Sequence, residues 1–175
     1  MEGAEKLERF ERELLPLMDD AYTLARYLAR DPHDAQDVVQ EAYLRALRYF
    51  DTYRGGDARA WFLTIVRHSC YTLRRTRLAA PEVQPAADTP AAEAPAADAA
   101  DRGALDADLR ATLSRALDTL APEFREAVVL RDVHGLSYRE IARVAGVPIG
   151  TVMSRLARAR KRLQSALGFT SREAS

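Results

Sequence analysis

A low-complexity segment divides this 175-residue chain near its middle. Residues 79–104 read AAPEVQPAADTPAAEAPAADAADRGA, with Val83 as the one large aliphatic side chain and Arg102 as the one cation. Such a composition buries too little apolar surface to offset the entropy lost on ordering, and its prolines interrupt any helix. We therefore predict a flexible linker at 79–104 between two small domains at 1–78 and 105–175.

Both predicted domains have the spacing of helices. Apolar residues recur at steps of three and four, and no strand-like alternation persists, so the fold class is all-α. Asp31 and Pro32 stop one helical pattern and can begin the next. The helices expected in the first domain cover residues 7–28, 34–50 and 58–77, with a loop at 53–57.

In the second domain, one helix carries the leucines from Leu105 to Leu120, and another opens at Pro122 and ends near His134. Ser137 followed by Glu140 is a capping box, which begins a further helix. Gly146 permits the left-handed conformation of a sharp helix end, and Pro148 marks the start of the next helix. This pair of helices fits a helix-turn-helix.

The second helix of that pair is strongly basic in a chain of zero formal net charge. It holds five cations and no acid between Ile149 and Arg162. On a helical wheel, one stripe should be buried; its members are Val152, Leu156, Ala159 and Leu163. The opposite face holds Ser154, Ala157, Arg158 and Lys161. Its edges hold Thr151, Arg155 and Arg162 on one side, and Met153 and Arg160 on the other.

Arginine on such a face can bind guanine edges, small apolar groups can meet thymine methyls, and edge cations suit phosphates. The helix is therefore predicted to dock in a DNA major groove. A solvated basic surface helix is the alternative.

The helix expected at 58–77 carries a second cationic face. No acidic residue lies between Asp57 and Glu82, whereas five arginines do. The core stripe comprises Phe62, Ile65, Val66, Ser69 and Leu73. Facing away from it are Thr64, Arg67, Tyr71 and Arg74, bordered by Trp61, His68 and Thr72. Cations beside aromatic rings can follow a phosphate backbone and stack unpaired bases, although a plain surface helix has the same pattern.

The helix around 37–47 has two apolar sides. Buried positions should be Val38, Val39, Ala42 and Ala46, while the other side holds Asp37, Gln40, Glu41, Leu44 and Leu47. Two leucines on an otherwise polar face indicate a protein partner. The alternative is a helix buried on two sides within the domain.

Neither an enzyme nor a membrane protein is expected. The histidines and Cys70 are scattered without metal-ligand spacing, and no phosphate-binding glycine loop or nucleophile–base pair is present, so we expect no metal, cofactor or catalytic residue. A single cysteine fits a reducing compartment, and no apolar run reaches the length of a spanning helix. We expect a soluble, cytoplasmic protein.

Three segments resemble the extracytoplasmic-function (ECF) sigma factors, the small two-domain branch of the bacterial sigma-70 family. DPHDAQDVVQEAYLRAL resembles the part of region two that grips the polymerase clamp. YRGGDARAWFLTIVRHSCYTLRR resembles the part that opens and reads the minus-ten element. LAPEFREAVVLRDVHGLSYREIARVAGVPIGTVMSRLARARKRL resembles region four, which reads the minus-thirty-five element. The three occur in the family's order, with a linker in place of region three.

The resemblance implies roles for residues at matching positions. Asp37, Gln40, Tyr43 and Leu47 would contact the clamp, within the partner face that also includes Glu41 and Leu44. Arg54, Gly55, Gly56, Asp57 and His68 would lie near the melted strand, beside the cationic face with Trp61, Arg67, Tyr71 and Arg74. Met153, Ser154, Ala157 and Arg158 would face bases, and Thr151 and Arg155 phosphates, with Lys161 on the same outward face.

The implied partners are core RNA polymerase, through its beta-prime clamp and beta flap, promoter DNA and a cognate anti-sigma factor. The sequence departs from the family's pattern at His68, where many members have Asn, and at Thr72, where many have Asp. Met153 occupies a position that is often cationic. The rival function is a free-standing helix-turn-helix regulator that acts without polymerase.

Overall fold

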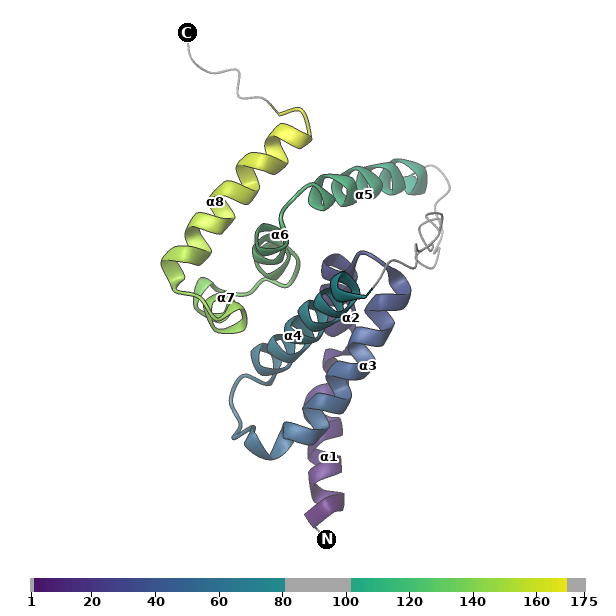
Figure 1. The fold of residues 1–175 in the computed structure, drawn as a ribbon, viewed down its shortest axis with the longest axis vertical. Helices are drawn as coiled ribbons and strands as arrows, with labels where there is room; N and C mark the ends of the chain where they lie inside the picture. Colours follow the sequence, from purple (N-terminus) through teal and green to yellow (C-terminus); the bar gives the residue numbers. More distant parts are fainter. Residues whose placement is uncertain (1, 81–101, 170–175) are drawn as a thin grey trace.

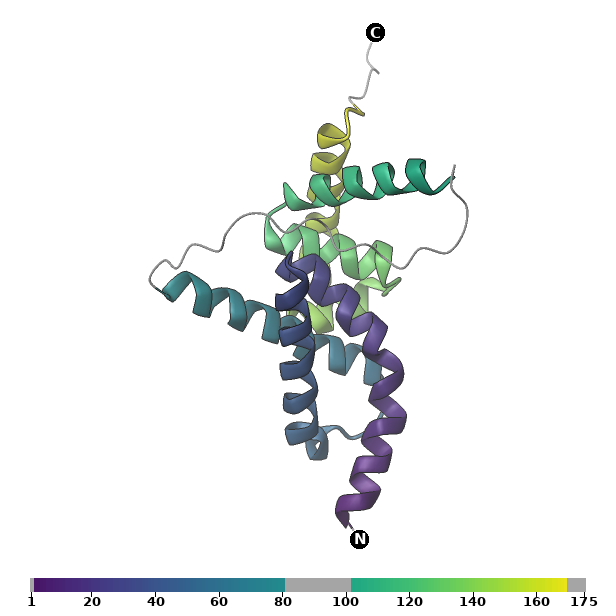
Figure 2. The same cartoon turned by 90° about the vertical axis from the view of Figure 1, so that its right-hand side faces the viewer.

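The computed structural model describes residues 2–80 and 102–169, and every regular element in these ranges is helical (Figures 1 and 2). This confirms the all-α prediction. Helix α4 (Ala58–Ala79) continues to Ala79 and α5 begins at Arg102, inside the predicted linker. The flexibility predicted for that linker concerns residues 81–101, which lie outside the described ranges.

The first lobe contains α1 (Glu2–Leu14), the 3₁₀ turn η1 (Leu15–Leu17), α2 (Met18–Ala29), α3 (Pro32–Tyr49), the 3₁₀ turn η2 (Phe50–Thr52) and α4. The continuous pattern expected over 7–28 is split in two, because η1 carries a proline in its first turn. Pro16 has no N–H to donate to an α-helical ladder. Asp31 caps α3 as predicted, with its side chain accepting a 3.0 Å bond from the Asp34 N–H.

The second lobe contains α5 (Arg102–Asp118), α6 (Pro122–Val128), the π-turn η3 (Val129–Val133), α7 (Tyr138–Ala145) and α8 (Ile149–Ala166). The capping box is present in full: Ser137 accepts from the Glu140 N–H, and the Glu140 carboxylate accepts from the Ser137 N–H. Gly146 ends α7 at a φ of 66°. The predicted helix-turn-helix is therefore confirmed. Of the predicted α8 stripe, Val152, Leu156 and Ala159 are buried and Leu163 is half-buried.

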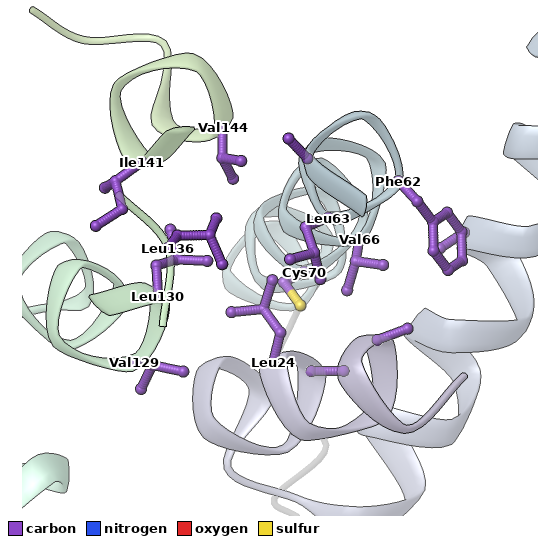
Figure 3. Close-up of a cluster of buried hydrophobic side chains, with 14 of the residues drawn as sticks. Leu24, Phe62, Leu63, Val66, Cys70, Val129, Leu130, Leu136, Ile141 and Val144 are labelled. Carbon is purple, nitrogen blue, oxygen red and sulfur yellow. The ribbon is translucent and has the colours of Figure 1, made fainter. Parts of the chain in front are cut away.

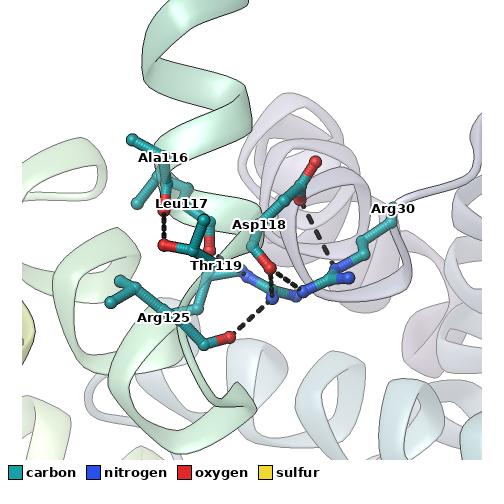
Figure 4. Close-up of polar contacts among 7 residues, drawn as sticks. Arg30, Ala116, Leu117, Asp118, Thr119 and Arg125 are labelled. Carbon is teal, nitrogen blue, oxygen red and sulfur yellow. Dashed lines mark hydrogen bonds and ion pairs between the residues drawn. The ribbon is translucent and has the colours of Figure 1, made fainter. Parts of the chain in front are cut away.

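Helix α5 is attached to the fold mainly by its end. Leu105, Leu109 and Leu113 are exposed, whereas Ala116 and Leu117 are buried. Figure 4 shows how that end is fixed by two arginines. The buried Arg125 side chain donates to the carbonyl oxygens of Leu117 and Leu120 at 2.9 and 2.8 Å. Arg30 reaches across from the first lobe, with its Nε 3.4 Å from an oxygen of the Asp118 carboxylate.

The two lobes pack against each other through a shared hydrophobic core. Helix α4 lies against α7, and α2 lies against α6. Figure 3 shows side chains from both lobes in this cluster; those of the first are Leu24, Phe62, Leu63, Val66 and Cys70, and those of the second Val129, Leu130, Leu136, Ile141 and Val144. Apolar area removed from water stabilises this contact at roughly 25 cal/mol per Å². The structure is thus a closed arrangement of two helical lobes.

Helix α4 is buried on more than one side because it lies between the lobes. Phe62, Val66 and Ser69 of the predicted stripe are buried, while its other members, Ile65 and Leu73, are half-buried. Leu63 and Cys70 fall outside that stripe and are nevertheless buried, at 1% and 6% exposure. Burial raises the pKa of the Cys70 thiol to about 12, so this cysteine is a packed apolar group rather than a reactive thiolate.

Candidate nucleic-acid and partner interfaces

The outward face of α8 is open to solvent. The predicted site residues there are exposed or half-buried; they are Thr151, Met153, Ser154, Arg155, Ala157, Arg158 and Lys161. Two neighbouring arginines are held by the second lobe. Arg160 lies 3.1 Å from the Asp132 carboxylate, and the Arg162 guanidinium lies 4.7 Å from the centre of the Phe124 ring. Among the ion pairs within residues 2–80 and 102–169, none involves Arg158 or Lys161. Both cations are therefore available to an external anion.

Arg155 occupies the inner edge of that face. It is half-buried and lines a small cleft together with Glu126 of α6. Burial raises the pKa of the Glu126 carboxyl, and the positive charges of Arg67 and Arg155 oppose that rise. Arg155 thus lies between the open face of α8 and a buried carboxylate.

The cationic face of α4 is partly covered, contrary to expectation. The helical wheel placed Arg67 and Tyr71 opposite the core of their own domain, where they would meet DNA. In the structure the second lobe covers them: Arg67 Nε donates to one oxygen of the Glu126 carboxylate, and the Tyr71 hydroxyl donates to the other at 3.2 Å. The Arg67 guanidinium also lies 4.7 Å from the centre of the Tyr71 ring. A wheel drawn for one domain cannot reveal a face that a second domain covers.

The remaining minus-ten candidates differ in access. Arg54, Gly55, Gly56, His68 and Arg74 are exposed. Gly55 and Gly56 have φ values of 89° and 100°, which glycine adopts without strain, so the loop turns sharply into α4. This loop and the exposed side of α4 remain open in the closed arrangement.

Two further candidates at the start of α4 are engaged within the chain. Trp61 is half-buried, with its ring centre 5.1 Å from that of Tyr53. Asp57 caps α4 by accepting from the Ala60 N–H at 2.9 Å. The Asp57 carboxylate also lies 3.6 Å from the Arg143 guanidinium of α7, so it joins the contact between the lobes.

An apolar groove of about 590 Å³ runs between α2 and α3. Of the predicted partner-binding residues, Gln40, Tyr43, Leu44 and Leu47 line it. Asp37 and Glu41 are exposed on α3 outside the lining, and Glu41 pairs with Arg45 at 2.6 Å. Leu44 is 56% exposed, so the alternative of burial within the lobe is wrong for Leu44, whereas Leu47 is half-buried against the core.

Sequence reasoning missed the opposite wall of this groove. Met18 and Tyr22 of α2 line it and are 49% and 37% exposed. Met18 was assigned to the single apolar series expected over 7–28, and Tyr22 was given no role. The break at Pro16 was the signal that this pattern comprises two helices with different buried faces.

A buried histidine lies at the contact between the lobes. The His134 side chain is 1% exposed, and its Nδ1 lies 3.4 Å from one oxygen of the Asp20 carboxylate. The other oxygen of Asp20 accepts a hydrogen bond from Arg59 at 2.7 Å. His134 Nε2 has no hydrogen-bond partner among the described residues. Burial lowers the pKa of His134, and the negative charge of Asp20 only partly offsets that effect.

Two models of protein families match separate parts of the chain. Residues 15–78 match the family model for sigma-70 region 2, and residues 110–163 match that for sigma-70 region 4. These two matches define the class of protein, a sigma-70 family member.

Individual relatives show which branch of the sigma-70 family is most similar to this chain. The ECF RNA polymerase sigma factor SigE of Mycolicibacterium smegmatis is 38% identical over 155 residues, which cover 89% of this chain and 60% of the relative. The RNA polymerase sigma-H factor of Pseudomonas aeruginosa is 33% identical, with 82% of this chain and 78% of the relative covered. The ECF sigma-E factor of Escherichia coli is 33% identical, with 75% of this chain and 73% of the relative covered. The chain therefore belongs to the ECF branch of the RNA polymerase sigma factors.

One solved structure aligns with most of the chain. The sigma factor RpoE of Bartonella quintana, determined in complex with the anti-sigma factor NepR, aligns with a TM-score of 0.71 and 30% identity. The alignment covers 92% of this chain and 98% of that protein. In the described residues there is no grouping of three potential metal ligands and no helix long and apolar enough to span a membrane.

The position of His134 predicts how stability depends on pH. Because its pKa is lowered in the folded chain, its contribution is fully present above the ordinary histidine value of about 6.5 and is lost as pH falls through the lowered pKa. We expect His134→Gln to flatten the fall in unfolding temperature between about pH 7 and pH 5. Differential scanning fluorimetry measures the unfolding temperature of the variant and the parent across that pH range.

The matched control is His33→Gln, which removes an exposed imidazole. Glu126 acts in the opposite direction, since its raised pKa favours the folded chain at lower pH. The difference between variant and parent curves therefore isolates His134. Parallel curves for His134→Gln and the parent would contradict the prediction.

Proposed function

We propose that this chain is an alternative sigma factor that binds core RNA polymerase and directs promoter-specific initiation in the cytoplasm, with no catalytic step of its own. The observation that supports this most strongly is the presence of two unlike surfaces on one chain. The cationic face of α8 suits DNA, and the apolar groove between α2 and α3 suits a protein. A free-standing regulator would have a use for the first surface but none for the second.

In this proposal, residues 105–175 read the minus-thirty-five element with α8. Arg158 projects from the open centre of the face and suits a guanine edge, while Ser154 and Ala157 lie beside it. Thr151 and Arg155 lie at the edge, where a phosphate backbone would pass.

Residues 1–78 would open the minus-ten element and bind the polymerase clamp. The loop at 54–57 and helix α4 would hold and open the minus-ten element, with Arg67, Tyr71 and Arg74 on the phosphates and bases. The groove lined by Gln40, Leu44 and Leu47 would receive the polymerase clamp. The beta flap and a cognate anti-sigma factor complete the proposed partners; the RpoE relative was solved with such an anti-sigma protein.

A reconstitution with purified core polymerase tests this function. The chain should co-elute with core polymerase in gel filtration. On promoters from the genome that encodes the chain, the complex should start each transcript at a defined position. A chain that binds double-stranded DNA but neither co-elutes with core nor starts transcripts would be the free-standing regulator.

Leu44→Asp should weaken the complex with core polymerase. Leu44 lines the groove and is 56% exposed, so the new carboxylate remains solvated in the free chain but would be buried against the clamp. We expect a loss of affinity of about tenfold or more, as for a central interface residue. Leu7→Asp on α1, at a leucine 45% exposed and outside the groove, is the control. Affinity for core polymerase is measured by fluorescence anisotropy. Equal affinities for the two variants would show that α3 is not part of the interface.

Arg158→Ala should relax preference at one or two base pairs of the upstream element. A bidentate arginine–guanine contact is worth roughly 1–3 kcal/mol of discrimination. Arg155→Ala should instead weaken all sequences alike and lower the salt dependence by about one phosphate contact. The measurement is initiation or binding across a library of upstream elements at two salt concentrations.

Arg160→Ala is the matched control for Arg158→Ala, since it removes the same charge from the same helix at a side chain paired with Asp132. Base preference should be unchanged in it. If Arg160→Ala changed base preference and Arg158→Ala did not, α8 would lie in the groove with a different face inward.

A further inference from the structure

Glu126 is a buried acid whose hydrogen-bond partners come from the other lobe. It belongs to α6 and is 1% exposed. Its two side-chain hydrogen bonds within the described residues are those from Arg67 and Tyr71, and both of these lie on α4. A carboxylate buried at this depth requires a cation or several donors. Packing within the second lobe does not explain a carboxylate at position 126, because an apolar side chain would fill the same space without needing hydrogen-bond donors.

The groups that hold Glu126 are those that would hold a nucleic-acid phosphate. A guanidinium N–H and a phenol O–H point at two oxygens of one anion, which is the donor set that a phosphodiester would use. A carboxylate and a phosphate cannot occupy those donors together. Glu126 therefore stands where an anion of the DNA backbone would bind α4.

Other contacts around Glu126 cover the same side of α4. Arg143 of α7 lies 3.6 Å from Asp57 at the start of α4. Leu63 and Cys70 on the flank of α4 belong to the core shared with Leu136 and Val144 (Figure 3). By contrast, the outward face of α8 remains exposed. The closed arrangement thus leaves the surface of α8 open and covers part of that of α4.

We propose that Glu126 is an internal competitor for DNA: it occupies Arg67 and Tyr71 in the closed chain, and the lobes must separate before α4 binds the melted strand. This inference rests on the proposed assignment of α4 to the minus-ten element. Separation removes the carboxylate and uncovers Arg67 and Tyr71 together, beside Arg74, which is already exposed. The closed chain therefore blocks DNA binding by α4 but not by α8, because the outward face of α8 stays exposed.

Glu126→Gln in the full chain tests the proposal. The amide keeps the size of the side chain but loses the charge that holds Arg67, so the lobes should separate more often. We expect a larger radius of gyration in small-angle scattering. We also expect tighter binding of a fluorescein-labelled, mixed-sequence 20-nucleotide single strand, by about tenfold, equivalent to about 1.4 kcal/mol in the closed–open equilibrium.

Glu123→Gln is the matched control, since it makes the same change of charge on the same helix at a half-buried residue. It should leave the radius of gyration unchanged and raise oligonucleotide affinity only slightly. Arg67→Gln breaks the same contact from the other lobe. It should enlarge the chain without the gain in affinity, because it also removes a group that binds the strand. Circular dichroism establishes that each variant remains folded, and Arg67→Gln supplies the test of opening if Glu126→Gln does not fold.

Two results would overturn the inference. If Glu126→Gln and Arg67→Gln were both as compact as the parent, the contact would not hold the lobes together. If Glu126→Gln opened the chain but bound the single strand no more tightly than Glu123→Gln, Glu126 would not compete with DNA. Failure of the proposed function is distinguishable, because it appears as a lack of co-elution and initiation by the parent chain.

Discussion

The arrangement of this molecule depends on the burial of α4 between two lobes. One side of α4 packs on α2 and α3 of its own lobe, and a second side packs on α7. Two of the ion pairs between the lobes involve α4 or its N-cap residue, namely Arg67 with Glu126 and Arg143 with Asp57. Because α4 also carries the proposed minus-ten surface, the contact that closes the chain and the surface that would bind DNA are on one helix. Stability of the closed arrangement and access to DNA are therefore coupled physically.

The local features of the fold could be predicted from the sequence, because short-range chemistry determines them. Asp31 before Pro32 caps α3, the Ser137–Glu140 box caps α7, and Gly146 ends α7 in the left-handed conformation. The buried stripe of α8 followed from its periodicity alone. Prediction was weaker where one proline separated two helices with different buried faces, as at Pro16 between α1 and α2.

The relation between the lobes could not be predicted in this way. A helical wheel assigns one buried side, so Leu63 and Cys70 had no place in the predicted core of α4. Glu126 gave no local signal, since an acid in an amphipathic helix usually belongs to the solvated side, and its partners lie far away in the sequence. The groove was predicted on its α3 side from two leucines on a polar face, whereas its α2 side became evident only in three dimensions.

The central claim is that the lobes are closed in the free chain and separate when it functions. The most direct test is the distance between dyes placed at His33 and Gln164, two exposed positions in different lobes, measured by energy transfer with and without core polymerase. The account predicts one short distance for the free chain and a longer distance in the complex. An unchanged distance on binding core, or an extended free chain, would contradict it.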